Sequence, residues 1–194
     1  MFRNYYIGRT DPLRGDRREM ECEIPPTTEG GATPPSIAHW DIAPPAGYFD
    51  ELARVSKNQI IWGGNYFDLP PTRCFIVWDK KMSENFSMAM CEYAWTSFGL
   101  NAKIFRAAPN GPAQGETRIH PTQKPVALYT WLLARYAKPG YKILDTHVGS
   151  ASSLIACRRA GLPYVGFEID PVYYRMACER LERELAQVNI TDLL

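Results

Sequence analysis

The sequence predicts an α/β protein with a Rossmann-like, mostly parallel sheet and helices on both faces. From residue 48 onward, short apolar runs alternate with helical patterns, which is typical of parallel strands joined by helices. An apolar run at 141–145 ends in Asp145, a loop of small residues follows, and a second apolar run at 164–168 ends in Glu168. The two acids are 23 residues apart. This is the layout of a βαβ unit that holds a nucleoside-containing cofactor.

The individual elements have local signals of their own. Apolar residues at helical spacing predict a helix over 48–55, and apolar runs predict strands at 59–62, 74–78 and 91–95. Residues 97–119 read as a polar connection without regular structure. Pro125 predicts the start of a helix that Pro139 and Gly140 end. A strand at 141–145, a helix at 151–160 and a strand at 164–168 follow, and Asp170 and Pro171 are typical first residues of a final helix.

Length and composition narrow the class of protein. The chain has 194 residues, enough for one domain with a proper core, and its net charge of +1 argues neither for nor against nucleic acid. No apolar run approaches the roughly 18 residues of a membrane span, and the first residues lack the apolar region of a signal peptide. The five cysteines form no C-x-x-C pair. We therefore expect a cytoplasmic protein without a structural metal.

The first 47 residues differ from the rest of the chain. They combine a charged cluster at 14–23 with paired breakers such as Pro25 and Pro26. A stretch of this length without regular structure is usually either functional or disordered. We expect one domain over 1–194, with an irregular N-terminal segment (1–47), a short recognition region (97–119) and a cofactor-binding half (120–185).

The run His120-Pro-Thr-Gln-Lys-Pro125, followed by a helix and by Asp145 with its small-residue loop, resembles the amino-group DNA methyltransferases. These enzymes methylate N6 of adenine or N4 of cytosine with S-adenosylmethionine. Residues 54–67 and 78–81 resemble phage-type members, and the resemblance covers about residues 40–185. It implies a seven-stranded methyltransferase sheet with one antiparallel strand. It also implies a permuted motif order, in which the catalytic motif precedes the recognition region and the cofactor motif comes last.

The resemblance implies a set of cofactor-binding residues. Glu168 would accept hydrogen bonds from the ribose hydroxyls, Ile169 would pack on adenine, and Lys124 would flank the methionine carboxylate. Ala151 stands where the family has a second glycine. On spacing alone, Asp145 could equally end a strand in another Rossmann-like protein, and the motif at 120–125 favours the cofactor pocket. The full set is Thr122, Lys124, Asp145, His147, Gly149, Ser150, Ser152, Ser153, Glu168 and Ile169.

The catalytic motif departs from the family pattern. An exocyclic amine is a poor nucleophile, and the family holds it with Asp or Asn, two prolines and an aromatic residue that stacks on the extruded base. Here Asp11 and Pro12 match the pattern, but Leu13 and Arg14 replace the second proline and the aromatic residue. Two readings stay open. Either Asp11 receives the amine and another aromatic residue stacks on the base, or the chain binds cofactor without turnover.

The recognition region carries the expected contacts to DNA. Lys103, Arg106 and Arg118 could touch phosphates or base edges, although each could also be a solvated surface residue. The expected partner is double-stranded DNA, with no membrane and no metal, and a homodimer is an open alternative. A methyltransferase that acts on RNA or on a small molecule is the remaining competing function.

Overall fold

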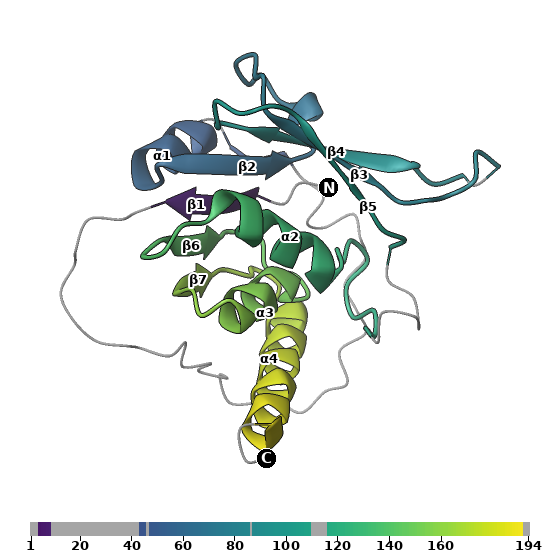
Figure 1. Ribbon diagram of the computed structural model, residues 1–194, viewed down its shortest axis with the longest axis vertical. Coiled ribbons are helices and arrows are strands. Elements are labelled where there is room, and N and C mark those ends of the chain that lie inside the picture. Colours follow the sequence, from purple (N-terminus) through teal and green to yellow (C-terminus); the bar gives the residue numbers. More distant parts are fainter. Residues whose placement is uncertain (1–3, 9–42, 46, 86, 110–115, 192–194) are drawn as a thin grey trace.

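The computed structural model describes residues 4–8, 43–45, 47–85, 87–109 and 116–191, and of 4–8 it describes the backbone alone. Most of the described strands lie in the first half of the chain, and most of the described helices lie in the second half (Figure 1). In chain order they are β1 (Asn4–Gly8), α1 (Tyr48–Val55), β2 (Asn58–Trp62), the 3-10 helix η2 (Gly64–Tyr66), β3 (Phe75–Asp79), β4 (Cys91–Thr96), β5 (Lys103–Arg106), α2 (Val126–Tyr136), β6 (Lys142–Asp145), α3 (Ser152–Arg159), β7 (Tyr164–Gly166) and α4 (Pro171–Thr191).

The strands form a mixed sheet in the order β5-β3-β4-β2-β1-β6-β7. Strand β1 joins the four strands on one side of it to the β6–β7 pair on the other (Figure 1). Pairs β3–β5 and β6–β7 are parallel, and the other four pairs are antiparallel. The α/β class is confirmed, but the predicted mostly parallel sheet with one antiparallel strand is wrong. Strands β1 and β4 run in the opposite direction to the other strands. Each of them has two neighbours, so each contributes two antiparallel pairs.

The predicted boundaries agree with the structure to within one or two residues for α1, α2, α3, β2, β3, β4, β6 and β7. Three described elements were not predicted: β1, the 3-10 helix η2 and β5. Strand β1 lies inside the N-terminal segment 1–47, which was expected to be irregular, so that expectation is wrong for residues 4–8. Strand β5 lies inside the connection expected to be irregular and pairs with β3 at the edge of the sheet. It is mostly exposed and begins and ends with Lys103 and Arg106. Its sequence therefore lacks the apolar run by which buried strands are recognised.

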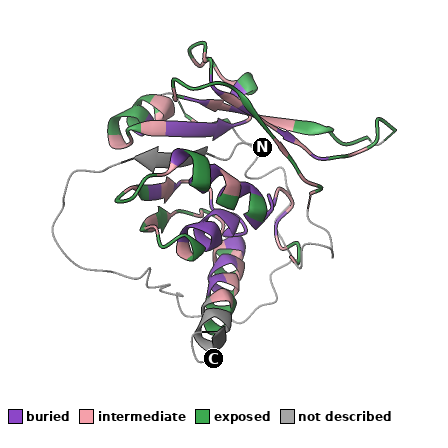
Figure 2. Ribbon diagram, viewed as in Figure 1, coloured by how far each residue is buried: buried purple, intermediate pink, exposed green. Residues whose placement is uncertain are grey.

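The helices lie on both faces of the β6–β7 part of the sheet. A side chain at Gly166 would collide with Val148 and with Leu154 of α3, so this face of β7 is closed by α3. Val165 and Leu144 are register partners on the opposite face, where they line a cavity together with residues of α1. Helices α2 and α3 pack against each other, as Figure 1 shows, and their apolar residues form the core coloured purple in Figure 2.

The carboxyl ends of β6, β7 and β2 and the start of β4 meet at one edge of the sheet, because β4 runs in the opposite direction. Ligands of open α/β sheets bind outside the carboxyl ends of the strands. The loops that leave this edge are therefore the place to look for a site.

Candidate cofactor site

Asp145 fixes the loop that follows β6. Its side chain is 3% exposed. Its Oδ1 accepts a hydrogen bond from the backbone N–H of His147 at 2.9 Å, and its Oδ2 accepts one from the hydroxyl of Ser153. One carboxylate thus ties the first residues of the loop to the first turn of α3. Both oxygens of Asp145 are thus bonded within the loop. Asp145 holds the loop in shape, and we expect a ligand to contact the residues next to it.

Glu168 closes the other side of the same loop. Its Oε2 accepts a hydrogen bond from the N–H of Gly149 at 2.6 Å, and its Oε1 accepts one from the N–H of Asp170 at 3.0 Å. The side chain is half-buried, and the adjacent Ile169 is 90% exposed. A carboxylate oxygen has two lone pairs, so Glu168 can accept further hydrogen bonds from a pair of hydroxyls.

The turn between Asp145 and α3 contains two residues in the left-handed region, Gly149 with φ 54° and Ala151 with φ 60°. Glycine adopts this conformation freely, whereas an L-residue with a Cβ pays about 1–2 kcal/mol. Ala151, which stands at the position of the family's second glycine, thus has a left-handed backbone conformation that glycine would adopt without this cost. Ser150, Ser152 and Ser153 are fully buried, and the hydroxyls of Ser150 and Ser152 lie 3.1 Å apart. These residues therefore build the turn from within.

The loop at 120–124 is held by its own side chains. The Nδ1 of His120 lies 3.2 Å from the N–H of Thr122 and 3.1 Å from its hydroxyl, and the imidazole packs on Tyr173 with ring centroids 4.2 Å apart. The Oε1 of Gln123 accepts the N–H of Ile119 at 3.0 Å. Because Tyr173 lies in the first turn of α4, this loop begins beside the Glu168–Asp170 segment.

The same loop ends in an ionic cluster of two buried lysines and a partly exposed glutamate. The Nζ of Lys124, a residue 2% exposed, lies 2.6 Å from Oε2 of Glu92, and the Nζ of Lys80 lies 3.0 Å from Oε1. The two ammonium groups also lie over indole rings, at 5.1 Å from the centroid of Trp62 and 5.5 Å from that of Trp78. Burial alone would raise the pKa of Glu92, but the two ammonium groups outweigh it and lower that pKa to about 2.

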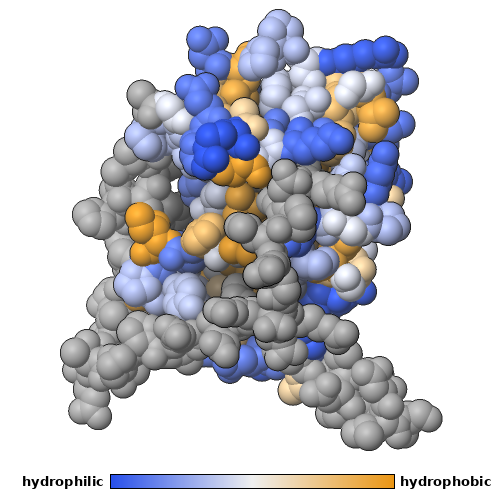
Figure 3. All heavy atoms as spheres, turned by 90° about the vertical axis from the view of Figure 1, so that its left-hand side faces the viewer, coloured by the Kyte–Doolittle hydropathy of each residue, from blue (hydrophilic) through white to orange (hydrophobic). Residues whose placement is uncertain are grey.

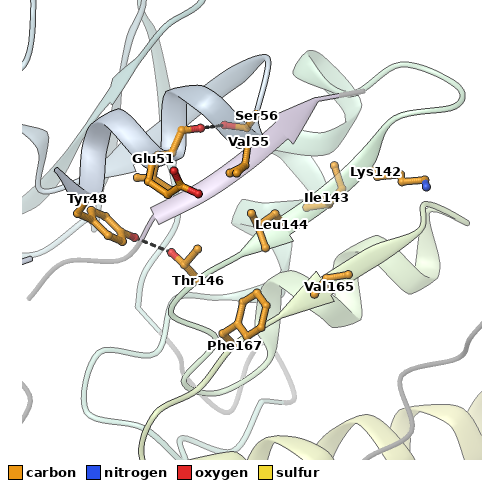
Figure 4. Close-up of a pocket in the computed structure, with 11 residues that line it drawn as sticks. Tyr48, Glu51, Val55, Ser56, Lys142, Ile143, Leu144, Thr146, Val165 and Phe167 are labelled. Carbon is orange, nitrogen blue, oxygen red and sulfur yellow. Dashed lines mark hydrogen bonds between the residues drawn. The ribbon is translucent and has the colours of Figure 1, made fainter. Parts of the chain in front are cut away.

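His147 connects the loop to α1. The hydroxyl of Tyr48 lies 2.7 Å from the hydroxyl of Thr146, a contact drawn in Figure 4, and 3.4 Å from Nδ1 of His147. Thr146 and His147 are themselves joined at 2.9 Å. His147 and Thr146 thus attach the loop after β6 to the first residue of α1.

A cavity of about 450 Å³ begins beside Thr146 and extends between α1 and the outer face of β6 and β7. Figure 4 shows Leu144, Val165 and Phe167 pointing into it, and Figure 3 shows hydrophobic patches among polar surface on the side of the molecule nearest α1. This cavity could not be predicted from the sequence, because its walls come from residues 48–56 and 142–167, which are far apart along the chain.

A second ion pair that sequence reasoning missed holds the turn before α3. Arg180 of α4 donates to the carbonyl of Ser150 at 2.7 Å and to the hydroxyl of Ser152 at 2.9 Å, and it pairs with Glu116 at 2.9 Å. The other oxygen of Glu116 accepts the N–H of Val126 at 2.9 Å, at the start of α2. Burial lowers the pKa of Arg180, against the opposing effect of Glu116. The pair joins α2, α3 and α4 behind the loop.

The residues expected to contact DNA behave differently from one another. Lys103 is exposed at the start of β5, and Arg106 at its end lies 3.4 Å from Asp79. Arg118 donates to the carbonyl oxygens of His120 and Pro121, so its guanidinium holds the loop described above. Lys103 and Arg106 lie at the two ends of the edge strand β5, with side chains on opposite faces of the sheet, and Arg118 belongs to the loop 120–124.

Asp11 and Pro12 lie outside the described residues, but the direction of β1 bears on them. Strand β1 is antiparallel to β6, with Tyr5 opposite Asp145 and Gly8 opposite Lys142. The chain therefore leaves β1 at the edge of the sheet away from Asp145. Within the described part of the chain, no helix is long and apolar enough to cross a membrane, and no three acidic, Cys or His side chains are grouped to hold a metal.

Comparison with known proteins gives a family. The model of the N6/N4 methyltransferase family, described as DNA methylase, matches residues 61–179, which is more than half of the chain. The chain belongs to this DNA methylase family. The match includes both halves of the site described above.

Individual relatives match shorter parts. The type II methyltransferase M.HpaI of Haemophilus parainfluenzae is 38% identical over 73 residues, 38% of this chain and 23% of the relative. The type II methyltransferase M2.DpnII of Streptococcus pneumoniae is 37% identical over 65 residues, 34% of this chain and 24% of the relative. The matches thus span about a quarter of each relative. Among solved structures, the M1.HpyAVI–SAM complex matches with 25% identity and a TM-score of 0.45, over 55% of this chain and 60% of that one.

Proposed function

We propose that this chain is a DNA methyltransferase that transfers a methyl group from S-adenosylmethionine to an exocyclic amine, N6 of adenine or N4 of cytosine. The observation that carries the proposal is the meeting of three segments at one sheet edge: the loop 120–124, the segment that follows Asp145 and the segment of Glu168. Membership of the DNA methylase family supports the same reaction. The permuted motif order is part of the proposal, since the cofactor segments come last in the chain.

The side chains fit this cofactor. Glu168 offers a carboxylate with spare lone pairs beside the N–H of Gly149, which suits a ribose with two hydroxyls. Ile169 offers an exposed apolar surface for the adenine, and Lys124 supplies a positive charge for a carboxylate. Bound S-adenosylmethionine supplies an electrophilic methyl group on a positively charged sulfur. Asp145, His147 and the serines before and in α3 keep the loop in the shape that these contacts need.

The chain must also accept hydrogen bonds from the N–H groups of the target amine. It must then take up the proton that the nitrogen loses when the new C–N bond forms. We propose Asp11 and Pro12 for this task, through the carboxylate of Asp11 and the carbonyl oxygen of Pro12. Lys103 and Arg106 are our candidates for contacts to the DNA backbone, at the edge formed by β5.

A second function is favoured by two observations. Leu13 and Arg14 replace the second proline and the aromatic residue of the catalytic motif. In addition, β1 ends opposite Lys142, at the edge away from Asp145. Both favour a chain that binds cofactor, DNA or both without turnover.

Methyl transfer from tritiated S-adenosylmethionine to unmethylated double-stranded DNA separates the two functions. The enzyme should label DNA, with N6-methyladenine or N4-methylcytosine as the product, and Asp11→Ala should abolish labelling while cofactor binding stays nearly intact. Asp16→Ala, a nearby carboxylate in the same segment, is the matched control and should keep full activity. Cofactor binding without labelling would support the second function, and labelling of RNA in place of DNA would overturn the choice of substrate.

A further inference from the structure

The proposed reaction needs an aromatic surface for the extruded base, and the catalytic motif does not supply one. Leu13 and Arg14 stand where the family has the second proline and the aromatic residue. A base that leaves the duplex loses its stacking neighbours, and a protein ring commonly replaces them. If the chain methylates DNA, an aromatic residue from another segment has to take this place.

Exposure narrows the choice of that residue. Among the described residues, Tyr66 and Phe167 are the exposed aromatic side chains, at 71% and 58%. Phe167 points into the cavity between α1 and the outer face of β6 and β7, as Figure 4 shows. Tyr66 is the last residue of η2. An exposed tyrosine is ordinary on a protein surface, so the argument depends on where Tyr66 lies.

Tyr66 follows the strand end that lies level with the candidate cofactor site. Tyr5 of β1 is the register partner of Ile60 on one side and of Asp145 on the other. Because one strand separates β2 from β6, these two residues are about 10 Å apart. Strand β2 ends two residues beyond Ile60, and η2 begins two residues later. Tyr66 therefore belongs to a turn that leaves the same edge of the sheet as the loop after Asp145.

Contacts on both sides of η2 connect it to the cofactor site. On one side, the end of the loop 120–124 places an ammonium group 5.1 Å from the ring centroid of Trp62, the last residue of β2. On the other side, Phe67 packs on Phe49 of α1 with ring centroids 4.7 Å apart. The residue before Phe49 forms the hydrogen bond to the loop after β6 that is drawn in Figure 4. The segment from β2 to Phe67 is thus joined to both loops, to one directly and to the other through α1.

The turn that carries Tyr66 is closely packed. Gly63 is in the left-handed region at φ 70°, and its N–H donates to the carbonyl oxygen of Tyr93 at 2.8 Å. A Cβ on Gly64 would lie 2.5 Å from the Cβ of Trp95, so the backbone of η2 lies directly against β4. The N–H of Tyr66 donates to the carbonyl oxygen of Gly63 at 2.9 Å. A ring on a backbone held in this way gives up little conformational freedom when a base stacks on it.

We propose that Tyr66 is the residue on which the extruded target base stacks, in place of the aromatic residue that the catalytic motif lacks. This inference rests on the proposed function. A base on Tyr66 would lie at the edge of the sheet where Glu168 and the loop 120–124 hold the cofactor. Every base has a π-face, so this contact would accept adenine and cytosine alike.

The test measures methyl transfer from tritiated S-adenosylmethionine to unmethylated double-stranded DNA. Tyr66→Ala should lower kcat/KM for DNA by about 10- to 100-fold, the loss expected for one stacked base. Tyr66→Phe keeps the ring and should stay within about threefold of wild type. Both variants should bind S-adenosylmethionine and unfold as the wild type does, because the side chain is exposed.

The matched control is Asp68→Ala, which changes another exposed side chain two residues further along the chain and should label DNA at the wild-type rate. Full activity of Tyr66→Ala would overturn the inference and leave the proposed function standing. Equal losses in Tyr66→Ala and Tyr66→Phe, or a parallel loss of cofactor affinity in Tyr66→Ala, would also overturn it, since neither depends on a stacked ring. A wild-type protein that labels no DNA would refute the proposed function itself, and this inference with it.

Discussion

Replacing Arg180 with methionine should destabilise the protein far more than replacing Arg159 with methionine. Both arginines pair with a glutamate, but their surroundings differ. The side chains of Arg180 and Glu116 are 12% and 14% exposed, whereas in the other pair Arg159 is 52% exposed and only its partner Glu184, at 12%, is buried to the same degree. Arg180 also donates to Ser150 and Ser152, so its loss would leave three acceptors without their partner.

The magnitude follows from this difference in burial. Removing one partner of a buried ion pair costs about 3–5 kcal/mol, and since this pair retains some exposure we take about 3 kcal/mol. For a chain of this size, that corresponds to a fall of about 6–12 °C in Tm. In the pair Arg159–Glu184 the arginine is half exposed, so its charge stays hydrated. We take about 1 kcal/mol for its loss, which should lower Tm by less than about 4 °C.

Thermal unfolding of the two variants, followed by circular dichroism at neutral pH, measures the difference. Urea unfolding at 25 °C provides an independent value for the free energy of unfolding. If the two variants unfolded at the same temperature, or if Arg159→Met were the less stable, the assignment of Arg180 as the buried anchor of the turn before α3 would be refuted.

Three further predictions concern single residues. Ala151→Gly should stabilise the protein by about 0.5–1 kcal/mol, because it removes the Cβ from a residue at φ 60°. Urea unfolding measures the difference, and a variant less stable than wild type would contradict this prediction. Tyr48→Phe loses the contact to Thr146, which should cost about 1 kcal/mol and lower Tm by about 2–4 °C; an unchanged Tm would mean that this hydrogen bond contributes nothing. The pKa of Glu92 is lowered in the folded state to about 2, so the stability from this carboxylate is present above its unfolded pKa of about 4.5 and is lost as the pH falls towards 2. The difference in the free energy of unfolding between wild type and Glu92→Gln should therefore be larger at pH 7 than at pH 3, and a difference that does not change with pH would contradict this assignment.

The sequence predicted the cofactor-binding half well because its signals are local. Asp170 accepts the N–H groups of Val172 and Tyr173, as its position before Pro171 indicates, and Gly161 ends α3 at φ +64°. A cap or a helix stop depends on a few neighbouring residues, so it can be read without knowledge of the fold.

The direction of the strands could not be read in the same way. An apolar run predicts that a strand is buried, but it does not say which way the strand runs beside its neighbours. The reversed directions of β1 and β4 therefore appear only in the structure. They matter for function, because the direction of β1 decides at which edge of the sheet the segment with Asp11 begins.

The supporting residues of the site were missed for a related reason. Glu92 is a charged residue in strand β4, and its partner Lys124 lies on a loop that is distant in the sequence. Arg180 and Glu116 are 64 residues apart, and neither is part of a motif. Such residues act through contacts that exist only after folding, so spacing along the chain does not mark them.

The central claim is that the Asp145–Glu168 unit binds S-adenosylmethionine. Equilibrium titration of the purified protein with S-adenosylmethionine tests it most directly, with Glu168→Ala as the comparison and Glu179→Ala, which removes an exposed carboxylate on α4, as the control. We expect saturable binding at one site per chain, strongly weakened by Glu168→Ala and unchanged by Glu179→Ala. Absence of binding by the wild-type protein, or equal binding by wild type and Glu168→Ala, would contradict the account.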